Sequence, residues 1–376
     1  MCKKKIIRAS TIPTSLDTFC KDVLKELSMS YEVVALSSPG KELDAIKTRE
    51  GVRTIAVTMQ RHISPLKDLI ALLKLIRVLR HERPWMVHSI TPKAGLLCML
   101  AAKMANVPVR IHTFTGLIWP TATGLKRKTL IFTDRILCSC ATHIIPEGKG
   151  VKNDLITHNI THKPLKILAN GNVRGIDLTY YNSTDEVLSV AKVLKKDNRF
   201  TFLFVGRIVK DKGIAELISA FNRLNAEYHN TRLVLVGHSE PQLDPLDKET
   251  LLSIETHHAI ESVGEIDDVR PWYAASDVLV FPSYREGFPN VVIEAGAMGL
   301  PAIVTDINGS NEIIINDKNG MIIPPKDSES LYRAMHEIYV NGQLRERLAS
   351  NARDLIESRY DCHIVRKALY DFYASL

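Results

Sequence analysis

One stretch of the sequence decides the fold: Phe281-Pro282-Ser283-Tyr284-Arg285-Glu286-Gly287-Phe288-Pro289-Asn290-Val291-Val292-Ile293-Glu294-Ala295. It opens at the end of the apolar run 278–281, which predicts a buried strand that stops at Pro282. A second apolar run, with helical spacing, begins near Asn290, a residue that suits a helix N-cap. A strand, a loop and a helix in this order form the repeating unit of α/β proteins.

The same order of elements recurs along nearly the whole chain. In the first half, we expect strands at 6–9, 31–36, 54–59, 86–90, 109–114 and 143–146, and helices at 17–27, 65–81, 93–104 and 125–140. In the second half, we expect strands at 202–205, 233–236, 261–263, 278–281 and 302–305, and helices at 215–224, 271–275, 291–298 and 328–340. Short apolar strands that alternate with amphipathic helices predict parallel sheets covered by helices on both faces.

Chain length and one cluster of turn residues predict two domains. A chain of 376 residues is too long for one ordinary core. Turn-forming Asn and Gly residues gather at 170–175. We therefore expect an α/β fold with two doubly wound, Rossmann-like domains, 1–170 and 171–357, which face a central cleft. Ligands bind such sheets at the carboxyl ends of the strands.

The two halves differ in charge. Residues 1–170 contain 27 Lys and Arg against 12 Asp and Glu, a net charge of +15, whereas the remainder carries a net charge of −8. A strongly basic half attracts anionic lipid headgroups, diphosphates or nucleic acid. The alternative is that these side chains only solvate the outer faces of helices. No basic motif with interleaved aromatic residues is present, so we expect no nucleic-acid partner.

The sequence lacks the motifs of several enzyme classes. It contains no G-x-x-x-x-G-K-[ST] P-loop, no G-x-G-x-x-G turn after the first predicted strand and no G-x-S-x-G elbow. The 6 cysteines and 13 histidines show no metal-ligand spacing, so we expect no metal site and no cofactor. No run of about 18 uncharged apolar residues occurs, and no apolar signal core follows the basic start. We therefore expect a cytoplasmic protein.

Two loops that follow predicted strands suit a phosphorylated sugar ligand. After the strand 202–205, Arg207 can hold two phosphate oxygens and Lys212 can supply a further positive charge. In the 281–295 stretch, Gly287 lets the backbone approach a ligand closely. The N–H groups of residues 288–291 would lie at a helix start, which favours phosphate. The carboxylates of Glu286 and Glu294 can accept hydrogen bonds from sugar and ribose hydroxyls.

Together these motifs resemble the retaining family 4 glycosyltransferases, which have the GT-B fold. The resemblance is carried by Glu286-x7-Glu294 within Pro-Ser-x-x-Glu-Gly-Phe-Pro and by Gly206-Arg207-x4-Lys212-Gly213. It extends over most of the chain through the segments 171–177, 275–278, 301–306 and 308–312. The segment 87–95 is similar to a stretch of the members that assemble bacterial polysaccharides.

The resemblance implies a role for each matching residue. Gly206, Arg207 and Lys212 would bind the donor diphosphate, and Glu286 would contact the transferred sugar, so that Arg207, Lys212 and Glu286 serve catalysis. Glu294 would bind the ribose, and the turn at Ile266 would hold the base. Backbone groups of the following residues would assist: Gly287, Phe288, Pro289, Asn290 and Val291. The resemblance also implies that a helix at about 358–376 packs back on the first domain.

Two segments depart from the family pattern. Thr115 stands where family members often carry a His that contacts the donor sugar, and the loop after the first strand lacks the usual Gly-Gly pair. We therefore assign Thr14, Ser15, Thr115 and Gly116 to an acceptor-side loop region in the first domain.

The resemblance predicts a hexosyltransferase that moves a sugar, with retention of configuration, from a nucleotide-diphosphate donor to a polyprenyl-diphosphate-linked saccharide. Uracil is the expected base, and capsule or O-antigen assembly the expected process. Residues 126–128 are basic and adjoin the apolar run 130–132, so we expect binding to an anionic membrane at the inner face of the cytoplasmic membrane. The alternatives are a nucleotide-sugar epimerase of similar architecture and a non-catalytic nucleotide-sugar-binding protein.

Overall fold

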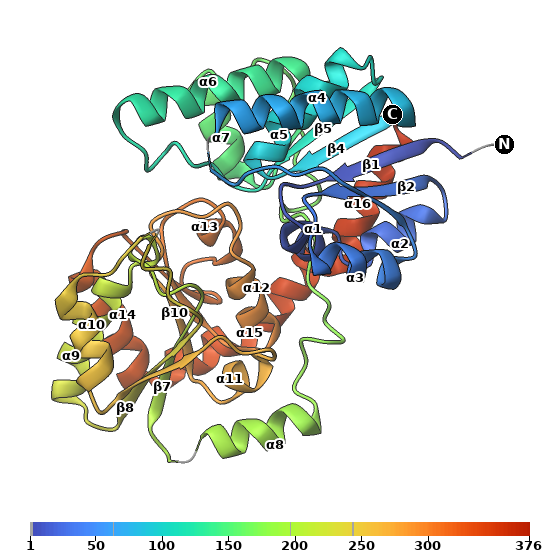
Figure 1. Cartoon of the computed structure of the whole chain (residues 1–376). Coiled ribbons are helices and arrows are strands. Elements are labelled where there is room, and N and C mark those ends of the chain that lie inside the picture. Colours follow the sequence, from blue (N-terminus) through green and yellow to red (C-terminus); the bar gives the residue numbers. More distant parts are fainter. Residues whose placement is uncertain (1–2, 63, 196, 243) are drawn as a thin grey trace. The chain divides into compact units, whose positions relative to one another are not determined.

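The computed structural model describes residues 3–62, 64–195, 197–242 and 244–376. The chain divides into two compact units. The first unit comprises Met1–Gly175 together with His363–Leu376, and the second comprises Ile176–Cys362. Each unit is an α/β structure with its own parallel sheet (Figure 1).

The first unit contains a six-stranded sheet with the strand order β3-β2-β1-β4-β5-β6. The strands are β1 (Lys5–Ala9), β2 (Glu32–Ser37), β3 (Arg53–Ala56), β4 (Met86–Ile90), β5 (Val109–Phe114) and β6 (His143–Pro146). All neighbouring strands pair in parallel. The order reverses between β1 and β4, the position at which doubly wound sheets bind their ligands.

Helices cover both faces of this sheet. One face carries α4 (Pro65–Glu82), α5 (Pro92–Met104), α6 (Gly124–Cys140) and α7 (Lys149–Thr157) over one buried cluster. The other carries α1 (Pro13–Cys20), α2 (Val23–Ser28), α3 (Lys41–Glu50) and α16 (Cys362–Ala374) over a second cluster. Figure 1 shows α4 and α6 on one side of the strands and α16 on the other. The two apolar layers explain why the strands are apolar on both sides.

The second unit repeats the topology with the strand order β12-β11-β10-β7-β8-β9. Its strands are β7 (Phe200–Val205), β8 (Thr231–Val236), β9 (Ile260–Gly264), β10 (Val278–Phe281), β11 (Ala302–Thr305) and β12 (Gly320–Ile323). All are parallel, and the order reverses between β7 and β10. The loops after these two strands are those that carry Arg207, Lys212 and Glu286.

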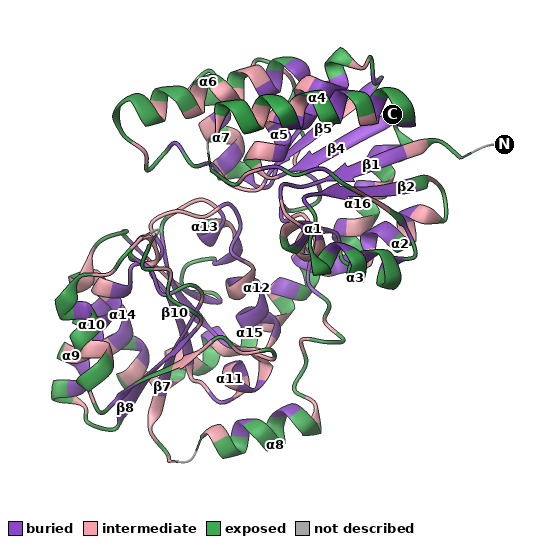
Figure 2. Ribbon diagram, viewed as in Figure 1, coloured by how far each residue is buried: buried purple, intermediate pink, exposed green. Residues whose placement is uncertain are grey.

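The helices of the second unit lie before, between and after its strands in the sequence. They are α8 (Asp185–Leu194), the 3₁₀ turn η1 (Lys210–Lys212), α9 (Ile214–Glu227), α10 (Lys248–Thr256), α11 (Arg270–Ala274), α12 (Asn290–Ala297), α13 (Ser310–Ile313), α14 (Ser328–Val340) and α15 (Gly342–Tyr360). Helix α9 packs against α14, and α12 packs against α15. Figure 2 shows the strands buried and the outer faces of these helices exposed.

The predicted fold class, an α/β fold with two Rossmann-like sheets, is confirmed. One predicted helix is wrong: residues 17–27 belong to two helices, α1 and α2. Between them, Asp22 adopts the left-handed conformation with a φ of +64°, which interrupts the helix. The strand predicted at 54–59 is shorter, ending at Ala56. Within the described residues, no helix is both long and apolar enough to cross a membrane.

The C-terminal helix α16 belongs to the first unit. The buried Arg8 of β1 donates a hydrogen bond from Nη1 to the Tyr373 hydroxyl at 2.7 Å. Arg366 pairs with Glu26 of α2 at 2.7 Å, and the Tyr370 hydroxyl donates to the same carboxylate at 2.5 Å. These contacts, together with the buried Leu369 and Phe372, fix the helix against the sheet face that also carries α1, α2 and α3.

Candidate functional site

The loop after β7 lies directly against the loop after β10. A Cβ atom on Gly213 would lie 2.1 Å from the Pro282 carbonyl oxygen, so only glycine fits this contact. Its φ of +71° is also in the left-handed region that favours glycine. The Tyr284 N–H donates to the Asp211 carbonyl at 2.8 Å, and Arg285 pairs with the Asp211 carboxylate at 3.0 Å. The two loops therefore form one surface.

Lys212 and Glu286 meet on this surface. The Lys212 ammonium forms an ion pair with Glu286 Oε1, and the Ser283 hydroxyl donates to the same oxygen at 2.8 Å. Both charged side chains are about 15% exposed, so each is held in place but remains reachable from solvent. The structure thus brings together two residues that the sequence assigns to the donor, although they are 74 positions apart.

Arg207 also has a carboxylate partner. Its Nη1 donates to Glu240 Oε2 at 2.5 Å, and His238 lies 3.3 Å from the other oxygen of the same carboxylate. Burial opposes ionisation of Glu240, but the hydrogen bonds from Arg207 and His238 outweigh it and lower the pKa. Sequence reasoning missed Glu240. The available signal was its position after β8, the strand beside β7.

Glu294 is buried, with 8% of its surface exposed, so its side chain does not face solvent as most helix glutamates do. The Tyr273 hydroxyl of α11 donates to Glu294 Oε2 at 3.1 Å. Tyr273 was not predicted, and its position on a separate short helix gives no sequence signal. A buried carboxylate held by a tyrosine is suited to accept hydrogen bonds from a diol.

The start of α12 differs from the prediction in one detail. Asn290 is the first helical residue and Pro289 occupies the cap position, so Asn290 is not the N-cap. Phe288 is buried, with its ring centroid 5.5 Å from that of Tyr360. The Phe288 side chain therefore belongs to the core, so at this position only backbone groups can face a ligand. Val291 is half-buried in the first turn of the helix.

The remaining predicted donor residues also follow strands of the same sheet. Gly206 directly follows β7, and its N–H donates to the Val236 carbonyl at 2.9 Å. Ile266 is half-buried in the loop after β9. A Cβ on Gly309 would lie 2.4 Å from the Gly287 carbonyl oxygen, so the turn that follows β11 supports the Glu286 loop from behind. All of these groups gather at the carboxyl edge of the second sheet.

The acceptor-side residues lie at the carboxyl edge of the first sheet. Thr14 and Ser15 form the first turn of α1 rather than a loop. Thr115 is half-buried after β5, and the adjacent Gly116 has a φ of +123°. Gly116 lines a cavity of about 250 Å³ beneath α6.

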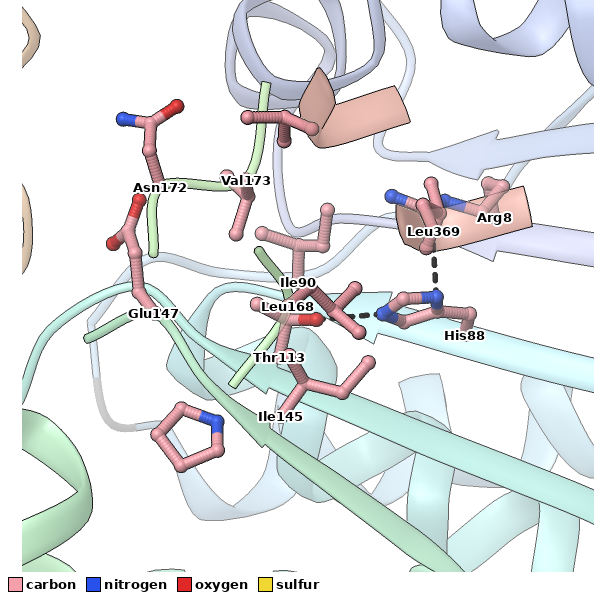
Figure 3. A pocket seen from close by; sticks show the side chains of 12 residues that line it. Arg8, His88, Ile90, Thr113, Ile145, Glu147, Leu168, Asn172, Val173 and Leu369 are labelled. Atoms are coloured by element: carbon pink, nitrogen blue, oxygen red, sulfur yellow. Dashed lines mark hydrogen bonds between the residues drawn. The ribbon is translucent and has the colours of Figure 1, made fainter. Parts of the chain in front are cut away.

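The buried histidine of β4, His88, is structural. Figure 3 shows His88 hydrogen-bonded to Arg8 and to Thr113, at 2.7 Å in each case. Burial, together with the charge of Arg8, holds the pKa of His88 well below its usual value. The cavity beside it has a volume of about 20 Å³, which suits roughly one water molecule and no sugar.

Comparisons with known proteins fit this geometry. Residues 188–355 match the family model described as glycosyl transferases group 1, and residues 19–171 match a glycosyl transferase 4-like domain. The capsular polysaccharide biosynthesis glycosyltransferase CapM of Staphylococcus aureus is 31% identical over 376 residues, which covers 99% of this chain and 97% of CapM. This chain belongs to the group 1 glycosyltransferases.

A second relative of this glycosyltransferase is an Escherichia coli enzyme, UDP-Gal:alpha-D-GlcNAc-diphosphoundecaprenol alpha-1,3-galactosyltransferase. It is 28% identical over 324 residues, which covers 83% of this chain and 81% of that enzyme. Among solved structures, Anabaena Alr3699/HepE in complex with UDP superposes with a TM-score of 0.82 at 19% identity, and all of both chains is covered. That likeness shows that the fold is shared.

The family predicted from the sequence is therefore confirmed, as is the prediction of a transferase. Membership of a transferase family leaves the epimerase alternative without support. The roles assigned to individual residues of the glycosyltransferase stay predictions, as does the expectation that it needs no metal ion or cofactor.

Proposed function

We propose that this glycosyltransferase moves a hexose from a UDP-sugar to a polyprenyl-diphosphate-linked saccharide during capsule or O-antigen assembly, with retention of configuration. The observation that carries the proposal is the ion-paired cluster at the carboxyl edge of the second sheet, where Arg207, Lys212 and Glu286 follow the two strands at which the strand order reverses. The names of the S. aureus and E. coli relatives support the process, the uridine donor and the lipid-linked acceptor.

In this proposal, the basic residues stabilise the departing nucleoside diphosphate. Positive charge next to the leaving oxygens lowers the free energy of the transition state, because negative charge develops on those oxygens. Lys212 and Arg207 are each engaged by one carboxylate, Glu286 and Glu240 respectively. The donor diphosphate would compete with these carboxylates for the two cations, so that binding exchanges one anionic partner for another.

The two family glutamates act as binders rather than as an acid/base pair. Once its ammonium partner turns to the diphosphate, the Glu286 carboxylate, still held by the Ser283 hydroxyl, accepts hydrogen bonds from hydroxyls of the transferred sugar. Glu294, whose carboxylate is held by the buried Tyr273 hydroxyl, binds the ribose. Retention without a protein nucleophile then depends on holding donor and acceptor in reactive geometry.

The first unit supplies the membrane-facing surface in this proposal. Lys126 and Lys128 of α6 are exposed, and so are the apolar Leu125 and Phe132 of the same helix. Helix α4 also exposes apolar side chains: Leu66, Leu69, Ile70 and Leu73. Exposed outer faces of both helices are visible in Figure 2. Exposed basic and apolar residues on one helix favour the surface of an anionic bilayer.

A donor panel tests the proposal. The enzyme is incubated with UDP- and other nucleotide-linked hexoses and a polyprenyl-diphosphate-linked saccharide, and released nucleotide, product mass and anomeric configuration are measured. We expect a glycosylated lipid product with the donor's configuration. An inverted product overturns the retaining mechanism, and an altered nucleotide sugar formed without acceptor would reveal an epimerase. Donor affinity without transfer to any acceptor would indicate a binding protein.

A vesicle assay tests the membrane part separately. We expect co-sedimentation with vesicles that contain anionic lipids at low salt, and loss of binding at high salt because ions screen the attraction. No binding to anionic vesicles at low salt overturns this part.

A further inference from the structure

The first unit contains an apolar cavity that the donor chemistry does not use. Its volume is about 250 Å³, and it lies beneath α6, beside the start of α5 and the segment that follows β5. Its apolar walls come from Leu96, Phe114, Leu117, Ile118, Trp119 and Leu130. We call it the Trp119 cavity. An apolar cavity of about 150 Å³ takes up benzene, so this one has room for roughly two isoprene units.

The lining residues of the Trp119 cavity are buried on its inner side and partly exposed at its opening. Trp119 is 1% exposed, and its indole N–H donates to the Asp134 carboxylate of α6 at 3.0 Å. Leu117 is also buried, whereas Ile118 is 38% exposed. Ile118 therefore lies at the mouth, where an entering chain would pass it.

Charged side chains border this apolar space. The exposed Arg61 lines the cavity, and the guanidinium carbon of Arg127 lies 5.7 Å from the centre of the Trp119 ring. Lys93 also lines it but is paired with the Asp68 carboxylate at 2.5 Å, and both Asp68 and Asp134 are lining residues. Arg61 is therefore the lining cation placed to meet an anionic head, and the apolar walls suit a hydrocarbon tail.

The cavity also adjoins the predicted acceptor loop. Phe114 and Gly116 are lining residues and flank Thr115 in the sequence. The same helix that walls the cavity with Leu130 and Thr133 exposes Leu125 and Phe132 on its surface. A chain that leaves a bilayer near α6 would therefore meet the cavity on the same helix, next to the acceptor loop.

We propose that the Trp119 cavity binds the first isoprene units of the lipid-diphosphate acceptor, with Arg61 at the diphosphate end. This inference rests on the proposed function for the identity of the acceptor. The cavity would select an isoprenoid-linked saccharide over a water-soluble one with the same sugar, because only the former fills the apolar space. It makes the lipid part of the recognised substrate rather than only an anchor.

A binding experiment tests the cavity independently of transfer. Geranyl diphosphate, which carries two isoprene units, is titrated into the full-length enzyme while tryptophan fluorescence is recorded, with inorganic diphosphate as the control ligand. The variants are Ile118→Asn, which places a polar group at the mouth, and Thr133→Phe, which fills the cavity. Ile156→Asn is the matched control, since Ile156 is an exposed apolar residue of α7 in the same unit and does not line the cavity.

We expect saturable fluorescence changes with geranyl diphosphate in the wild type and in Ile156→Asn. In Ile118→Asn and Thr133→Phe, half-saturation should need about ten-fold more ligand or be lost, because an apolar fit is sensitive to single groups. Circular dichroism checks that each variant is folded, and Ile118→Asn keeps the test decisive if Thr133→Phe does not fold. Equal binding by all four proteins, or an equal response to inorganic diphosphate, overturns the proposal.

A transfer experiment separates this inference from the proposed function. Two acceptors with the same diphosphate-linked saccharide are compared in detergent solution, one with a polyprenyl chain and one with a methyl group. We expect Ile118→Asn to raise KM for the polyprenyl acceptor about ten-fold and to leave the methyl acceptor unchanged. An equal effect on both acceptors overturns the inference alone. If the wild type uses neither acceptor, the proposed function fails, and the geranyl diphosphate titration still decides the cavity.

Discussion

Lys212 and Glu286 form an ion pair that joins the loop after β7 to the loop after β10. These are the two strands at which the order of the second sheet reverses. The Ser283 hydroxyl and the Tyr284 N–H, both after β10, reinforce the same junction by donating to the Asp211 carbonyl after β7. The ion pair therefore holds both charged side chains at the point where the two loops meet.

Replacing Lys212 with alanine should lower kcat by about 100- to 1,000-fold, the range found when one charge-stabilising group is removed from an active site. The donor KM should also rise, because the diphosphate loses a cation. Steady-state kinetics with a saturating acceptor measures both. Lys210→Ala is the matched control, since Lys210 lies on the same turn but is exposed. Equal losses in both variants would assign the effect to the loop rather than to the ion pair.

Replacing Glu240 with glutamine should strengthen UDP binding by roughly two- to five-fold, the value of a largely exposed ion pair. Arg207 is 44% exposed and donates to Glu240, so removal of that negative charge leaves the guanidinium more available to a diphosphate. Calorimetry with UDP measures the change. Glu265→Gln removes a nearby exposed carboxylate that does not pair with Arg207 and should leave affinity unchanged. Weaker UDP binding by Glu240→Gln would contradict the proposal that Glu240 and the diphosphate compete for Arg207.

Replacing Glu294 with glutamine should weaken UDP binding about ten-fold and abolish any preference for UDP over its 2′,3′-dideoxy analogue. A buried carboxylate forms stronger hydrogen bonds to a diol than an amide does. Tyr273→Phe, which removes the hydroxyl that holds the carboxylate, should show a smaller effect in the same direction. Undiminished UDP affinity and turnover in Glu294→Gln would show that Glu294 does not bind the donor.

Asp134 should make stability depend on pH. Burial raises the pKa of this carboxyl from 3.8 to about 7, and the hydrogen bond from Trp119 only partly opposes the shift. Because the folded state holds the proton more tightly, its contribution to stability is fully present below about pH 4 and is lost as pH rises through about 7. Asp134→Asn, which keeps an acceptor for Trp119, should gain up to about 4 kcal/mol of unfolding free energy at pH 8 and much less at pH 5.

Denaturant unfolding at the two pH values measures this difference. Asp44→Asn, at an exposed position on α3, is the control and should gain nothing at either pH. A gain for Asp134→Asn that is the same at pH 5 and pH 8 would show that the effect does not come from ionisation.

Much of the fold could be predicted because strands buried on both faces are continuous apolar runs. The runs at Val109–Phe114 and Val278–Phe281 are strands with the predicted bounds. Helix α15 was missed because its buried residues Leu348, Ala352 and Ile356 form only a narrow stripe on a charged helix. The break at Asp22 depends on a single left-handed residue, and hydrophobic periodicity does not report backbone dihedral angles.

The candidate site could be predicted in part. Lys212 and Glu286 follow strands that sheet topology makes neighbours, so their contact follows from the order of elements. The partners Glu240 and Tyr273 could not be predicted. Each is a single polar residue outside any motif, and its contact with Arg207 or Glu294 depends on where its side chain points. The Trp119 cavity was also missed, since it depends on how α5, α6 and the segment 116–119 pack.

The position of α16 has a consequence for biosynthesis. The sheet of the first unit is formed by residues 5–146, but one of its faces is completed by the helix Cys362–Ala374. During translation, the hydrogen bond between the buried Arg8 and Tyr373 cannot form until the entire second unit has been synthesised. The second unit, which is continuous in sequence, can fold first. A nascent chain that lacks its last helix would leave Arg8 and Tyr31, the partners of Tyr373, and the apolar cluster that this helix completes open to chaperones.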